Sequence, residues 1–170
     1  PFVAAKKSSL PPGKISILAQ SGGICFMLWR LLTQAHIGAA KIVSMGNKLD
    51  LDEIDYLKYL EQDPKTSVIG LYLEGIRRGR ELMEAGRASS KPLIVHKANT
   101  GGHSEQIAKH HTAALANDDR IVEAAFRQAN IVRTRDFRSF LNSVRAFSIP
   151  PMRGNELVII SRSGRFALIA

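Results

Sequence analysis

A chain of 170 residues, 45% hydrophobic and 23% charged, has the size and composition of one soluble globular domain. No apolar run approaches the roughly 20 residues of a membrane-spanning helix, and Phe2-Val3-Ala4-Ala5 is too short for a signal-peptide core. The single cysteine, Cys25, excludes a disulfide within the chain, so we expect a buried thiol and a cytoplasmic location.

Strand-like and helix-like segments alternate along the chain. In chain order we expect a strand over 14–19, a helix over 24–36 ended by Gly38, a strand over 41–45, a helix over 52–62, a strand over 67–73, a helix over 77–88, a strand over 92–96, a helix over 120–128, a strand over 131–133 and a helix from 136 to 147. This alternation predicts an α/β fold, a three-layer α/β/α sandwich with a parallel sheet. Right-handed crossovers and the flavodoxin-like strand order 2-1-3-4-5 are expected.

Acidic residues precede several of these helices. Asp118 or Asp119, and Asp136 stand where N-caps are expected, and Asp50, Asp52 and Glu53 give the helix over 52–62 an acidic first turn. Acidic groups also suit the positive end of a helix dipole, so these positions should fix where the helices begin.

Domain boundaries follow from the composition. Residues 1–13 should be an irregular N-terminal segment, because Pro11-Pro12-Gly13 interrupts regular structure, and residues 14–147 should form the domain. Residues 148–155 are typical of a linker, and 156–170 hold a strand and the first turn of a helix. A helix that short is not stable alone, so we expect 156–170 to be the truncated start of a second flavodoxin-like domain in a longer protein.

The net charge of +9 raises the question of nucleic-acid binding. The basic residues form no block of about five or six like charges, and no aromatic residues alternate with them as stacking platforms. An anionic ligand or an acidic partner surface accounts for the charge equally well. We therefore expect no nucleic-acid partner and no membrane partner.

Polar or glycine-rich loops follow three of the expected strands. They are Gln20-Ser21-Gly22-Gly23, Leu73-Glu74-Gly75 and the loop that leads to His110-His111. Because the carboxyl ends of parallel strands meet at one edge, Glu74, His111 and the glycine-rich helix start should share a crevice. Such a set suits a histidine that receives and passes on a phosphoryl group, with neutral imidazole as the nucleophile.

Each of these residues also has a plainer interpretation. His111 could be a solvated loop histidine, Glu74 a solvated strand-end acid, and Ser21-Gly22-Gly23 an ordinary tight turn. The role of Lys97 stays open: its side chain could contact a phosphate or could be solvated. His36 and His96 are expected to be structural.

A metal site is not expected. His103, His110 and His111 lie in a glycine-rich segment without a cysteine or a clustered acid, which is a poor ligand set for zinc.

At residues 14–165 the chain resembles the NDP-forming acyl-CoA synthetase superfamily, which includes ADP-forming acetyl-CoA synthetases and the succinyl-CoA synthetase alpha subunit. The ordered motifs that carry the resemblance are Ala19-Gln20-Ser21-Gly22-Gly23, Ser44-Met45-Gly46-Asn47, Gln62-Asp63-Pro64-Lys65-Thr66, Leu71-Tyr72-Leu73-Glu74-Gly75, Lys91-Pro92-Leu93-Ile94-Val95-His96-Lys97 and His111-Thr112-Ala113-Ala114-Leu115-Ala116.

The resemblance implies roles for the loop residues. His111 matches the histidine that the family phosphorylates, and Glu74 matches the glutamate that pairs with it. Ser21, Gly22 and Gly23 match the start of the helix whose N-terminus faces the phosphate. The chain departs from the family at His110, where serine is usual, and at Ala113, where glycine is usual.

The resemblance also implies a function. The chain would be the central ligase domain of an enzyme that interconverts acyl-CoA, ADP and phosphate with free acid, CoA and ATP, through an acyl phosphate and a phosphohistidine. CoA, ATP or ADP and Mg are expected for the full enzyme and none bound in this piece, which alone should be inactive. Its partners would be an ATP-grasp domain or subunit, a CoA-binding domain and the acyl substrate.

Two further classes of function stay open beside this one. The domain could be a non-catalytic, acyl-CoA-responsive regulatory domain of a protein acetyltransferase, or a nucleic-acid-binding module whose affinity falls steeply with salt. The sequence does not name the acyl group or the nucleotide base, and it leaves homo-oligomerisation open.

Overall fold

The computed structural model describes residues 10–99, 118–150, 154, 158 and 160. Ten helices and strands lie within these ranges. They are β1 (Pro12–Ala19), α1 (Gly22–Gln34), β2 (Ala39–Ser44), α2 (Glu53–Gln62), β3 (Val68–Leu73), α3 (Gly79–Ala88), β4 (Leu93–Lys97), α5 (Asp119–Gln128), β5 (Val132–Thr134) and α6 (Phe137–Ser148).

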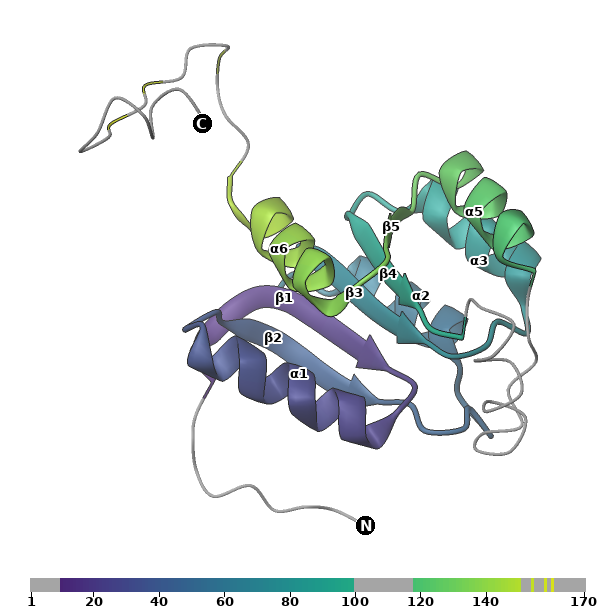
Figure 1. Ribbon diagram of the computed structural model, residues 1–170, viewed down its shortest axis with the longest axis horizontal. Helices are drawn as coiled ribbons and strands as arrows, with labels where there is room; N and C mark the ends of the chain where they lie inside the picture. Colours follow the sequence, from purple (N-terminus) through teal and green to yellow (C-terminus); the bar gives the residue numbers. More distant parts are fainter. Residues whose placement is uncertain (1–9, 100–117, 151–153, 155–157, 159, 161–170) are drawn as a thin grey trace.

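The five strands form one parallel sheet in the order β2-β1-β3-β4-β5 (Figure 1). Helices α1 and α6 cover one face, and α2, α3 and α5 cover the other (Figure 1). The predicted three-layer, flavodoxin-like α/β fold and its strand order are therefore confirmed.

Alternating side chains of the central strands build a core on each face of the sheet. On β3, all of whose residues are buried, Ile69 and Leu71 join the core under α2, α3 and α5. Val68 and Tyr72 join the core under α1 and α6. Between them Gly70 leaves room for α6, since a Cβ there would lie 2.8 Å from the Phe140 ring. Burial of both faces explains why this strand is an unbroken apolar run.

Aspartates cap three of the helices, and of these caps Asp118 and Asp136 were predicted, whereas Asp52 was expected inside the first turn of its helix. The Asp52 carboxylate accepts from the Ile54 N–H at 2.9 Å, and Asp55 reaches back to the Asp52 N–H at 3.0 Å, which completes a capping box. Asp118 caps α5 and Asp136 caps α6 in the same way.

The predicted end of α1 at Gly38 is wrong. The helix ends at Gln34, and His36 takes the left-handed conformation with φ of 52°. Gly38 instead stands where the chain enters β2 beside the start of β1, and a Cβ there would lie 2.4 Å from the Pro12 carbonyl oxygen. Glycine is therefore required at position 38 because the chain passes so close to the start of β1 there.

The ends of the described domain differ slightly from the predicted boundaries. β1 begins at Pro12, so Pro12 and Gly13 belong to the strand, where Pro12 pairs with Ala39. α6 extends to Ser148. Apart from Val158 and Ile160, the predicted second domain over 156–170 lies outside the described residues. No helix in the described part of the chain is long and apolar enough to span a membrane.

Candidate functional site

The carboxyl ends of β1, β3 and β4 lie side by side, because β3 pairs with both of the others. The loop that starts at Gln20 therefore lies beside the loop of Glu74, as predicted. Gln20 links the two directly, since its side-chain oxygen accepts from the Glu74 N–H at 2.9 Å. His111 lies outside the described residues, which end at Asn99 after β4 and resume at Asp118.

Helix α1 begins at this edge with its first N–H groups available. Ser21 is the N-cap, and its hydroxyl accepts from the Ile24 N–H at 3.4 Å. Gly22 and Gly23 are exposed, and no residue that the structure describes accepts a hydrogen bond from their N–H groups. Free N–H groups and the positive end of the dipole together suit the binding of an anion such as phosphate.

Neither glycine is required by the local fold. A Cβ on Gly22 would lie 3.6 Å from the Ser44 hydroxyl oxygen, and one on Gly23 would lie 3.9 Å from that of Ser21, both ordinary contact distances. Both residues have helical backbone and neither has a positive φ. A tight turn that needs glycine does not explain this pair, whereas close approach of a ligand to the backbone does.

Alanine substitution of these glycines should leave the fold intact. For Gly22→Ala and Gly23→Ala we expect an unfolding free energy that is unchanged or raised by up to about 1 kcal/mol, because alanine favours helix. Gly70→Ala is the contrasting control and should lose about 1–3 kcal/mol through overpacking against Phe140. Urea unfolding, followed by the fluorescence of the single tryptophan, Trp29, measures all three. A large loss at Gly22 or Gly23 would contradict the interpretation of an open anion site.

Glu74 is the first residue after β3, and its side chain is partly exposed. No hydrogen bond or ion pair joins its carboxylate to the residues that the structure describes. Burial, together with the negative charge of Glu74, raises the pKa of Tyr72 to about 12. The Glu74 carboxylate is thus available to a group outside the described ranges.

Two buried lysines, Lys97 and Lys48, also lie at this edge. The sequence alone did not assign a role to either of them. Lys97 is 4% exposed, so the solvated alternative predicted for it is wrong. Its ammonium donates to the carbonyls of Glu74, at 2.9 Å, and Ala98, at 2.6 Å. Burial, and next the positive charge of Arg133, lower the pKa of Lys97 to about 8. Its position at the end of an apolar strand is the one signal that could have marked it.

Lys48 was not predicted as a site residue. It is 5% exposed, donates to the Gly75 carbonyl at 2.6 Å and pairs with the buried carboxylate of Glu53 at 2.9 Å. The pair links the loop after β2 and the start of α2 to the Glu74 loop.

The remaining candidates have structural surroundings. His96 stacks with Tyr72 and contacts Phe137, and its Nδ1 lies 3.2 Å from the Thr134 carbonyl oxygen. Burial lowers the pKa of His96, which favours the neutral ring. Cys25 is half-buried rather than fully buried, and burial raises the pKa of its thiol.

Metal ligands do not gather in the described ranges, where no group of three or more His, Cys, Asp and Glu could hold an ion. His103 and His110, which were weighed as ligands with His111, lie outside these ranges.

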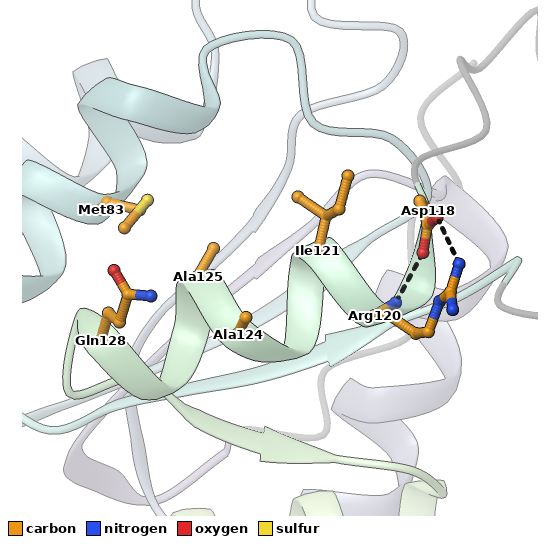
Figure 2. Close-up of a pocket in the computed structure, with 7 residues that line it drawn as sticks. All are labelled: Met83, Asp118, Arg120, Ile121, Ala124, Ala125 and Gln128. Carbon is orange, nitrogen blue, oxygen red and sulfur yellow. Dashed lines mark hydrogen bonds and ion pairs between the residues drawn. The ribbon is translucent and has the colours of Figure 1, made fainter.

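A surface hollow lies along α3 and α5 (Figure 2). Its lining residues are Met83, Asp118, Arg120, Ile121, Ala124, Ala125 and Gln128. Figure 2 shows Asp118 bonded to Arg120 at one end of the hollow. Neither Glu74 nor the start of α1 contributes to it, so the candidate site is the carboxyl edge and not this hollow.

The strand order and the covering helices define a flavodoxin-like α/β domain, and its candidate ligand site is the open helix start beside Glu74. Residues 12–147 match the family described as the succinyl-CoA ligase like flavodoxin domain, and the chain belongs to this family.

The chain is also similar in sequence to curated ADP-forming CoA ligases. The chain is 37% identical over 155 residues to an ADP-forming acetate–CoA ligase II of Archaeoglobus fulgidus, covering 89% of this chain and 23% of that protein. It is 36% identical over 164 residues to the ADP-forming acetate–CoA ligase I subunit alpha of Pyrococcus furiosus, covering 94% of this chain and 35% of the subunit. The chain thus spans less than two thirds of the length of these relatives.

A solved structure of an acetyl-coenzyme A synthetase has the same fold over the matched part of the chain. A dinucleotide forming acetyl-coenzyme A synthetase 1 of Ca. Korarchaeum cryptofilum, in complex with phosphate and ADP, superposes with a TM-score of 0.77. The two chains are 34% identical, and the match covers 84% of this chain and 32% of the other.

Proposed function

We propose that this chain is the ligase domain of an NDP-forming acyl-CoA synthetase, which interconverts an acyl-CoA, ADP and phosphate with the free acid, CoA and ATP. The observation that carries the proposal is the open N-terminus of α1 beside Glu74. Both lie at the carboxyl edge of the sheet, and the segment of sequence that contains His111 follows β4, another strand that ends at this edge. The names of the relatives, which are ADP-forming ligases, support the same reaction class.

In the proposed reaction phosphate attacks the acyl carbonyl of the acyl-CoA at this edge, which releases CoA and forms an acyl phosphate. His111 takes the phosphoryl group, which releases the free acid, and then passes it to ADP to form ATP. The Glu74 carboxylate accepts a hydrogen bond from one ring nitrogen, which fixes the tautomer and leaves the other nitrogen free to attack. The N-terminus at Ser21-Gly22-Gly23 stabilises the charge of the phosphoryl group.

One helix start is not sufficient for this transfer. A helix dipole contributes about 0.3–1 kcal/mol when exposed and about 2 kcal/mol when partly buried. We therefore propose that an ATP-grasp domain or subunit supplies a second phosphate site, with Mg and ATP, and that a separate domain binds CoA. This chain alone would then be inactive, because it would lack both.

The nucleotide products of the full-length protein test the proposed function. With acetate as a first acyl substrate, CoA, Mg and ATP, we expect thioester, ADP and phosphate in equal amounts. Formation of AMP and pyrophosphate would contradict the proposal. The relatives give no support to a regulatory domain of an acetyltransferase, and binding of acyl-CoA without any thioester synthesis would be its signature.

A further inference from the structure

Side chains from two other loops and from the last residue of β4 hold the main chain of Glu74 and Gly75. Gln20 accepts from both N–H groups with one oxygen, at 2.9 Å for Glu74 and 3.2 Å for Gly75. Lys97 donates to the Glu74 carbonyl at 2.9 Å, and Lys48 donates to the Gly75 carbonyl at 2.6 Å. Both N–H groups and both carbonyls of the two residues are therefore bonded by side chains from elsewhere in the sequence. We call these three side chains the Glu74 clamp.

The clamp is buried, which makes each of its bonds costly to lose. Gln20 is 8% exposed, Lys48 5% and Lys97 4%. A buried donor or acceptor left without a partner is unfavourable for folding, and more so when it is charged. These side chains therefore hold the loop in one conformation.

Lys97 differs from Lys48 in how its charge is compensated. Lys48 has a carboxylate partner in Glu53, whereas Lys97 bonds two carbonyls and forms no ion pair with the residues that the structure describes. A buried ammonium without a carboxylate is unfavourable for folding. Its bond to the main chain of Glu74 points to a role at the site.

We propose that Gln20 and Lys97 are positioning residues, which hold the backbone of Glu74 so that its carboxylate keeps the position that phosphoryl transfer requires at this edge of the sheet. This inference rests on the proposed function. The Glu74 carboxylate has no hydrogen bond to the described residues, so the clamped backbone is what determines its starting position. A displacement of about 1 Å at such a group can slow a reaction by about 100-fold.

A double-mutant cycle in the full-length protein tests Gln20. The measurement is the initial rate of phosphoryl labelling from ATP, with and without Glu74→Gln. Gln20→Met, or Gln20→Asn if methionine prevents folding, should slow labelling by about 10- to 100-fold with an unchanged KM for ATP. In the Glu74→Gln background it should cause no further loss, because Gln20 acts through Glu74. An equal loss in both backgrounds, or no loss in either, overturns the inference.

A matched control is available within β1, at a residue that is not part of the clamp. Ser16 is buried and its hydroxyl bonds that of Thr66 at 2.8 Å, so Ser16→Ala removes one buried polar bond that involves no clamp residue. Labelling by this variant should match that of the unmodified protein. If the unmodified protein takes no label, the proposed function fails and the inference with it; a labelled protein with unaffected Gln20 variants overturns the inference alone.

The pH dependence of labelling tests Lys97. With a pKa of about 8, its ammonium is charged below that pH and loses its charge above it, and charge-assisted hydrogen bonds are about twice as strong as neutral ones. The groups that act on it are Arg133 and Lys48, which lower its pKa, and Asp119 and Glu74, which raise it. Labelling should therefore slow as the pH rises through about 8. Below pH 8, labelling of the Lys97→Met variant should be about 10-fold slower than that of the unmodified protein, and its rate should not fall as the pH rises through 8. If the variant shows the same fall in rate, Lys97 has no such role.

Discussion

The His111→Ala variant of the full-length protein should take up no phosphoryl label from ATP, and its thioester synthesis should fall by about 10³-fold or more. A covalent intermediate cannot form without its nucleophile, and loss of a nucleophile removes most of the rate enhancement. The measurement is labelling with ATP, followed by mapping of an acid-labile, base-stable phosphate. In the unmodified protein we expect that phosphate on the peptide that contains His111.

The neighbouring histidines provide matched controls for this variant. His110→Ala and His103→Ala remove the same chemical group from the same segment of sequence and should keep the label. Label that persists in His111→Ala would end the proposal of a phosphohistidine at this position. Label lost equally in all three variants would indicate a disturbed segment rather than a lost nucleophile.

Most of the fold could be predicted from local patterns. The apolar run of β3 and the caps Asp118 and Asp136 appear in the structure where the sequence places them. These signals depend on residues close in sequence. The end of α1 could not be predicted in the same way, because Gly38 is required by its approach to Pro12, which is a tertiary contact.

The candidate site shows the same division. Ser21 and Glu74 could be placed because each lies within two residues of the end of a strand, and parallel strands end at one edge. The Glu74 clamp could not be predicted, because its bonds join residues 54, 27 and 23 positions apart in the chain. A lysine or glutamine after a strand has the same local pattern whether it is solvated or buried against another loop.

The buried pair of Lys48 and Glu53 carries the largest expected effect on stability. Both side chains are almost fully buried, at 2% and 1% exposed, and the Lys48 ammonium also bonds the Gly75 carbonyl. Lys48→Met leaves the Glu53 carboxylate buried without its partner, which should lower the unfolding free energy by about 3–5 kcal/mol. Lys48 has a positive φ of 54°, and methionine meets the same backbone cost there, so the loss reports the side chain. Urea unfolding monitored through Trp29 measures it.

Two further variants separate the lost charge pair from the lost lysine. Arg120→Met removes a cation from an exposed pair with Asp118, in which the arginine is 93% exposed, and should change stability by about 0.5 kcal/mol or less. The double variant Lys48→Met/Glu53→Leu removes both buried charges and should recover most of the loss, because the uncompensated carboxylate is gone. If Lys48→Met alone unfolds at the same urea concentration as the unmodified chain, Glu53 is not held by this pair. If the double variant recovers nothing, the bond from Lys48 to Gly75 accounts for the stability, and the Glu74 clamp rather than the ion pair holds this edge together.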